Sequence, residues 1–440
     1  MSTEIREPAP DAHDAAESDE VASDAALAAP EIIADSFGEY VKIWLTRVRS
    51  GDSGFLPVLL GLVAIVIYFQ VRNSHFLTAG NLVNLITQAA WIVTLGMAEV
   101  FVLLLGEIDL SIGFSAAFGA VFTCWVLVPP NPWPWPIAVL VGLAVPAVYG
   151  AIQGIIITRL RLPSFVVTLA GQLAGLGLLL AIMNQAAPNS GGTIRLYSNV
   201  LSDIETGSMS PVVGWIVTIV AVVLAGGLFV VRDSRKRASK LAAPPASVTW
   251  LKVAAMAVAG VVVVLIGNLN RGPFLVVVRG VPWVVLVIVA VTVIYSFLLG
   301  RTRFGRYIYA IGGNAEAARR AGINLSRIRV AAFTLAGLTA GISGIIYASQ
   351  LGSISTGVQG GNNVLLAVAA AVVGGVSLFG GRGKMVGALL GGVIVAVIYN
   401  GLGLLGLGAA QQNLWTAAVL LVAVAVDTTA RRNQSSANIR

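Results

Sequence analysis

Long apolar runs alternate with short polar connections along most of this chain. The runs approach the roughly 20 residues that an α-helix needs to cross a bilayer. They predict spanning helices at residues 55–71, 82–105, 110–128, 136–158, 163–183, 212–231, 250–268, 281–299, 330–350, 362–379, 385–403 and 411–427. The expected fold class is therefore all-α, a polytopic helical membrane protein with about 10–12 transmembrane helices over residues 55–428.

A shorter amphipathic segment precedes the first apolar run. Its apolar positions recur at helical spacing, with Lys42, Arg47 and Arg49 off that face. They are Phe37, Tyr40, Val41, Trp44, Leu45 and Val48. This pattern is typical of a helix that lies in the membrane interface, so we expect one within residues 31–54. A loose juxtamembrane linker is the alternative.

The two ends of the chain are polar. Residues 1–30 are rich in Ser, Ala, Asp and Glu, and such a segment buries too little apolar surface to order itself. It has no basic start followed by an apolar core, so it is not a signal peptide. We predict a disordered acidic cytoplasmic tail at 1–30 and a short cytoplasmic tail at 429–440.

Composition and charge agree with a membrane protein. The chain is 57% hydrophobic and 11% charged, with a mean hydropathy of +0.87, whereas soluble domains carry about 25% charged residues. The net charge of +8 is explained by cations in the cytoplasmic connections. Twelve crossings with both termini inside leave only Arg72, Arg195, Arg271 and Arg279 on the outer side, so a nucleic-acid partner is not expected.

Motifs for catalysis, metal binding or nucleotide binding are absent. The chain has one cysteine, Cys124, and two distant histidines, His13 and His75, which argues against a disulfide framework and a His-based metal site. GLGLLG at 401–406 follows no predicted strand, and LFGGRGKM at 378–385 lacks the first glycine and the Ser/Thr of a phosphate-binding loop. We expect no enzymatic activity, no catalytic residue, no metal and no bound cofactor.

One polar stretch, GGNAEAARRAGI at 312–323, has its own helix start and stop signals. Asn314 suits the N-cap, and Gly322 suits the left-handed position after the last turn. Between them lie Glu316, Ala317, Ala318, Arg319, Arg320 and Ala321. Because so short a helix is marginal in water, packing on the flanking spans or on another protein must hold it. The alternative is a basic inner loop with an incidental helical turn.

Polar residues inside the spans are candidates for a translocation pathway, because such residues are costly in a membrane. Asp109 and Ser111 also suit a cap for a helix that begins near Leu110. Glu107 suits either a pair with an inner-loop arginine or a cavity beside an interrupted helix, and residues 106–113 are either an inner turn or a break at mid-membrane. Amide side chains suit hydrogen bonds to hydroxyls or to neighbouring helices. The candidates are Gln88, Glu99, Glu107, Asp109, Gln172, Asn362, Asn363 and Asn400.

Several motifs in chain order resemble the permease subunits of ABC importers for monosaccharides, in the ribose/xylose branch and most like the xylose type. The likeness runs from about residue 55 to 428 and includes the additional hydrophobic pair at 212–268. It is carried by GEIDLSIG (106–113), LPSFVVTLAGQLA (162–174), YIYAIGGNAEAARRAGI (307–323), GGVSLFGGRGK (374–384) and YNGLGLLG (399–406).

This resemblance implies a function and a set of partners. The helix around Glu316–Gly322 would be a coupling helix that docks on a separate ATP-binding subunit, which holds the ATP. An extracytoplasmic sugar-binding protein and a second permease copy would complete a homodimeric importer in the lipid of the bacterial cytoplasmic membrane, with both termini cytoplasmic. The sugar would be a xylose-like pentose or a related monosaccharide. The chain departs from the xylose type at Glu99, Val364 and Leu366, so the exact sugar stays open.

Two other functions are compatible with the residues alone. A stand-alone ion-coupled sugar carrier would use Glu99 as a proton site. A membrane scaffold would recruit soluble partners through residues 301–329 and the acidic tail.

Overall fold

A computed structural model describes residues 36–49, 56–186, 191–239, 243–272, 276–356, 360–408, 410–418 and 421. The predicted tails at 1–30 and 429–440, and much of the predicted span at 411–427, lie outside these described residues. By its internal contacts the chain divides into two units, residues 1–47 with 221–257 and residues 48–220 with 258–440. Each unit is described by itself.

The eleven predicted spans from 55–71 to 385–403 each correspond to a helix in the same order. Among the described residues, eight helices are long and apolar enough to cross a membrane, and the three shorter apolar ones are α3, α5 and α15. Their bounds are α3 (Leu56–Arg72), α4 (Ala79–Leu103), α5 (Ile112–Trp125), α6 (Trp135–Leu160), α7 (Ser164–Ala186), α9 (Pro211–Ala238), α10 (Ala246–Asn268), α11 (Val284–Arg301), α14 (Leu325–Leu351), α15 (Gly360–Val373) and α16 (Met385–Leu404). The all-α polytopic fold class is confirmed.

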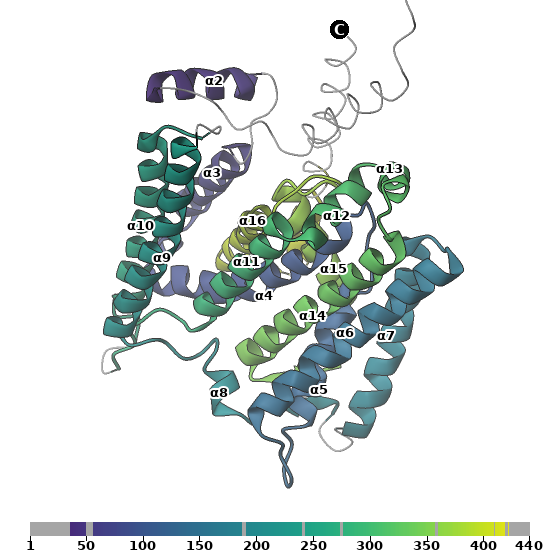
Figure 1. Ribbon diagram of the computed structural model, residues 1–440. Coiled ribbons are helices and arrows are strands. Elements are labelled where there is room, and N and C mark those ends of the chain that lie inside the picture. The colour runs from purple at the N-terminus through teal and green to yellow at the C-terminus, as the bar shows by residue number, and fades with distance from the viewer. Residues whose placement is uncertain are drawn as a thin grey trace, which may run out of the picture. The chain divides into compact units, whose positions relative to one another are not determined.

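The larger unit is organised around α14, which packs on α4, α5 and α6. Figure 1 shows the short helix α13 (Ala315–Arg320) at one end of α14 and α8 (Asn199–Ser202) near the other. Helices α15 and α16 pack against α4 and against each other. The resulting core is made largely of small and branched apolar side chains from these helices.

Small residues bring α14 and α6 into backbone contact. A Cβ at Gly337 would overlap the carbonyl oxygen of Pro146, and a Cβ at Gly150 would overlap that of Phe333. Lipid tails are as apolar as leucine, so helices in a bilayer associate through such close packing rather than through the hydrophobic effect. Glycine at these positions therefore sets the distance between the two helices.

The structure adds features that the hydropathy pattern did not predict. Strand β1 (Thr193–Arg195) pairs antiparallel with β2 (Ser353–Ser355), with Ile194 opposite Ile354. Helix α9 continues to Ala238, seven residues past the predicted span end at 231, because its last turn is basic and long cationic side chains can extend to the interface.

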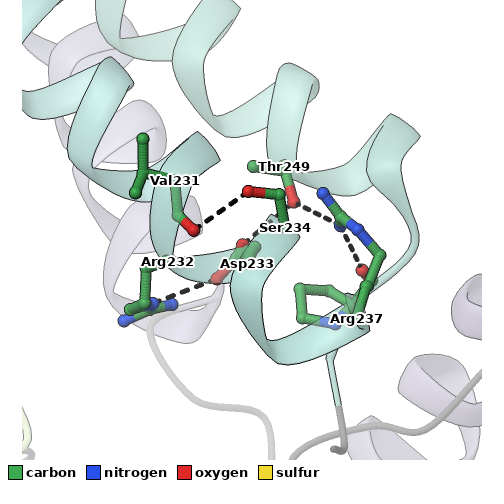
Figure 2. A network of polar contacts seen from close by, with 7 residues as sticks. Val231, Arg232, Asp233, Ser234, Arg237 and Thr249 are labelled. Atoms are coloured by element: carbon green, nitrogen blue, oxygen red, sulfur yellow. Dashed lines mark hydrogen bonds and ion pairs between the residues drawn. The ribbon is translucent and has the colours of Figure 1, made fainter. Parts of the chain in front are cut away.

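The smaller unit contains α2 (Phe37–Arg49) and the facing halves of α9 and α10. A buried carboxylate joins these two helices: Asp233 accepts hydrogen bonds from Arg232 Nε at 3.0 Å and from Thr249 Oγ1 at 2.9 Å (Figure 2). Arg237 also contacts Thr249 and donates to the Pro244 carbonyl. Because both helices contribute, this network fixes the end of the α9–α10 hairpin. The interfacial position of α2 stays a prediction.

The close packing of α14 on α6 predicts opposite outcomes for two glycines. Gly337→Ala should lower the free energy of unfolding by about 1–3 kcal/mol, because the added methyl forces two backbones apart. Gly177→Ala on α7, where no atom lies within 4 Å of the added Cβ, should raise it by up to about 1 kcal/mol, because alanine is the better helix former. Thermal unfolding of the purified variants in detergent measures both, and equal midpoints for the two variants would contradict the packing described here.

Candidate coupling site and translocation pathway

Helix α13 has the start and stop that its sequence predicts. The Asn314 side-chain oxygen accepts hydrogen bonds from the backbone N–H groups of Glu316 at 3.1 Å and Ala317 at 3.0 Å. Gly322 has a φ of +81°, and the Ile323 N–H reaches back to the Ala318 carbonyl, which forms a Schellman cap. Local capping therefore satisfies several of the backbone groups that so short a helix leaves open.

The side chains of α13 divide into one buried residue and an exposed polar surface. Of its six residues, all described, Ala318 alone is buried, and it joins the main apolar core. The three alanines of this stretch therefore differ in environment, with Ala318 packed inward and Ala317 and Ala321 exposed. Glu316 pairs with Arg319 at 2.8 Å and Arg320 at 3.3 Å, and the bond from Arg319 lowers the pKa of the Glu316 carboxyl.

The base of α13 is held by backbone contacts with two other turns. Helix α12 (Arg303–Gly313) ends directly before α13, and a Cβ at Gly312 would overlap the Leu104 carbonyl oxygen. That carbonyl also accepts a hydrogen bond of 2.9 Å from the Gly381 N–H, and Tyr309 donates to the Gly383 carbonyl. The segment 106–113 is therefore a turn at the end of the molecule that carries α13.

A chain of polar contacts runs inward from this turn. Asp109 accepts bonds from the Ser111 N–H at 2.8 Å and hydroxyl at 2.6 Å, and its own N–H donates to Glu99. The Gln153 amide donates to the Ser111 hydroxyl at 2.7 Å. Asp109 thus organises the turn before α5, but the helix begins at Ile112 rather than near Leu110 because these bonds hold residues 109–111 outside it.

Glu107 forms the ion pair that was one of its two expected roles. Its Oε1 lies 2.6 Å from Nε of Arg329, on the second turn of α14. The pair is largely shielded, with side-chain exposures of 10% for Glu107 and 30% for Arg329. It links the α4–α5 turn to α14 at the end that carries α13.

Three of the amide candidates for the pathway contact neighbouring helices instead of lining a cavity. Asn400 on α16 exchanges hydrogen bonds with Asn81 and also donates to Gln88 at 3.2 Å. This cluster joins α16 to α4, which is the helix–helix alternative for Gln88 and Asn400. Gln172 lies beside Gly361.

One candidate, Asn363, lines a cavity between α4, α5, α14 and α15. Trp91 and Tyr347 face each other there edge to face, with ring centroids 5.0 Å apart. The Ser343 hydroxyl, also at the cavity, donates to the Trp91 carbonyl. In this conformation the space holds roughly one water molecule. The neighbouring candidate Asn362 is exposed and does not line it.

The sequence alone did not identify several of these residues. Arg329, Trp91 and Tyr347 lie in ordinary basic or apolar surroundings along the chain, so only their partners mark them. Glu205 was also missed: its carboxyl is buried and has no hydrogen-bond partner within the described segments, and burial raises its pKa to about 9. Glu205 is therefore neutral at physiological pH, which explains how it is buried without a cation.

A family model gives the chain its classification. The model described as the branched-chain amino acid transport system permease component matches residues 81–426. The chain belongs to this permease family. The match takes in the capped helix α13, the turn at 106–113 and the four helices around the cavity.

Individual relatives of the permease align along nearly their whole length. The xylose transport system permease protein of Escherichia coli (strain K12) is 34% identical over 381 residues, covering 85% of this chain and 92% of its own. The corresponding protein of Haemophilus influenzae is 31% identical over 88% of this chain and 99% of its own. The ribose import permease protein of Escherichia coli (strain K12) is 30% identical over 88% and 95%. No solved structure matches the permease.

The cap of α13 predicts a local effect on backbone stability. Asn314→Ala should cost about 1 kcal/mol of helix stability, which corresponds to roughly fivefold faster amide exchange in α13. Hydrogen exchange measured by mass spectrometry on the permease in detergent tests this. Asn324→Ala, which removes the side-chain cap of α14, is the matched control and should leave α13 unchanged. Equal exchange in α13 for wild type and Asn314→Ala would contradict the cap's role.

Proposed function

We propose that this permease is the membrane subunit of an ABC importer that moves a monosaccharide into the cytoplasm. A separate ATP-binding subunit supplies the energy, an extracytoplasmic sugar-binding protein delivers the substrate, and two permease copies form a homodimer. The substrate is a xylose-like pentose or a related sugar, since the xylose and ribose permeases quoted above align along almost their full length.

The observation that carries this proposal is the construction of α13. Its backbone is capped at both ends, one alanine anchors it in the core, and its charged side chains project outward. Exposed ion pairs contribute little stability, so Glu316, Arg319 and Arg320 serve the permease itself only weakly. A rigid, exposed helix of this kind suits docking in a cleft of the ATP-binding subunit.

The pathway in this proposal passes the cavity between α4, α5, α14 and α15. Aromatic faces suit the apolar face of a sugar ring, and the Asn363 amide and Ser343 hydroxyl suit its hydroxyl groups. The cavity admits little in the present conformation, so passage requires these helices to separate. Alternating access through rigid movements of packed helices would achieve that.

Orientation follows from charge and stays part of the proposal. The basic connection that carries α13 would face the cytoplasm by the positive-inside rule, with both termini on the same side. The ion-coupled carrier is less well supported, because Glu99 accepts a bond from the Asp109 backbone and does not line the cavity. The scaffold hypothesis leaves that cavity without a role.

Co-reconstitution in liposomes tests the function directly. The permease is combined with a candidate ATP-binding subunit and a candidate sugar-binding protein from the same genome, and uptake of radiolabelled pentoses and hexoses is measured. We expect uptake only when all three proteins and ATP are present. Gradient-driven uptake by the permease alone would favour the ion-coupled carrier, and no uptake of any sugar with the full set would overturn the proposal.

Two substitutions in the exposed stretch test the coupling role of α13. Glu316→Arg reverses the charge at the start of α13, and Gly322→Pro cannot adopt the positive φ of the cap. Each should reduce ATP-driven uptake by about tenfold or more, the scale of a typical coupling energy, while the permease still inserts. Uptake at the wild-type rate in both variants would remove α13 from the coupling mechanism.

A further inference from the structure

The ion pair between Glu107 and Arg329 joins the turn before α5 to α14, and both of these helices contribute to the lining of the cavity. Glu107 belongs to the turn that leads into α5, and Arg329 lies on α14. Ala116 and Ala117 of α5 line one side of the cavity, and Tyr347 of α14 lines another. The pair therefore spans the cavity-lining helices at the end of the molecule where α13 lies.

The pair is also close to α13 along the chain. Only residues 321–323 separate the end of α13 from Asn324, whose side chain caps α14 by accepting a bond from the Arg327 N–H at 3.0 Å. Arg329 follows within the second turn. The connection has a Schellman cap on one side and an N-cap on the other, so its backbone conformation is restricted. A displacement of α13 should therefore also displace Arg329.

The geometry of the pair is incomplete. Arginine and a carboxylate can form two parallel bonds, but here Oε1 of Glu107 lies 2.6 Å from Arg329 Nε without hydrogen-bond geometry, and neither that Nε nor the buried Oε2 has a hydrogen-bond partner among the described residues. A shielded ion pair is weak evidence for stability, since desolvation offsets much of its attraction. A purely structural pair would be expected to satisfy both oxygens. The free Oε2 leaves a bond to be made in a second arrangement.

We infer that the Glu107–Arg329 pair transmits movement of α13 to the cavity that α5 and α14 help to line, and that its contact is remade during each transport cycle. Glu107 and Arg329 are positioning residues, because neither lines the cavity. The inference rests on the proposed function and adds to it the link between the docking helix and the pathway.

The test measures ATP hydrolysed per sugar imported by the reconstituted complex. Glu107→Gln and Arg329→Gln should each raise this ratio about tenfold, within the usual range of coupling factors, because hydrolysis continues while its effect on the pathway is lost. The charge swap Glu107→Arg with Arg329→Glu should bring the ratio back toward wild type. Arg329→Lys keeps the positive charge but lacks the planar guanidinium group that can form two parallel bonds, so it should give an intermediate ratio.

Arg327→Gln is the matched control. Arg327 lies on the first turn of α14, is exposed, and forms no ion pair with the described part of the chain, so its ratio should equal that of wild type. Wild-type ratios in both single variants would overturn the inference. The inference would also be overturned if the single variants lost hydrolysis and uptake equally and the charge swap restored neither. That result would indicate a role in folding alone. If the wild-type complex itself imports nothing, the proposed function fails and the ion pair loses its role with it.

Discussion

The backbone contact between Gly312, the Leu104 carbonyl and Gly381 constrains the position of α13 relative to the turns beside it. Three turns meet there without side chains between them: one ends α12, one follows α4 and one lies between α15 and α16. No flexible group can yield at this point, and the Leu104 carbonyl is held by a hydrogen bond as well. Displacement of α13 must therefore displace the turns that begin α5 and α16.

Close backbone contacts at glycine residues also occur along the helices. Gly337 and Gly150 bring α14 and α6 into backbone contact, so these two helices cannot come closer together at those points. Interiors packed at this density pass strain on instead of absorbing it. A small helix at one end can then act on a cavity between α5 and α14, which lies farther along the same helices.

The features that could be predicted from the sequence are local in origin. Eleven spans follow from apolar runs, and both ends of α13 follow from Asn314 and Gly322, because capping depends on residues only a few positions apart. The partner of Glu107 could not be named, since many arginines lie in the basic connections and Arg329 is 222 positions away along the chain. The inward position of Ala318 and the pairing of Gln88 with Asn400 likewise depend on tertiary packing. Of the residues that line the cavity, only Asn363 was a candidate from the sequence, because Trp91 and Tyr347 do not differ in sequence from other residues of apolar helices.

Distances between spin labels in the working complex test most directly whether α13 and the neighbouring turns move as one body. In a Cys124→Ala background, one label is placed at Ala321→Cys and the other at Phe379→Cys, in the turn before α16. If α13 and these turns move as one body, this distance stays the same when ATP is added, while the distance from Ala321→Cys to Gly177→Cys on α7 changes. A change in the first distance with no change in the second would show α13 moving independently of those turns, which contradicts the account.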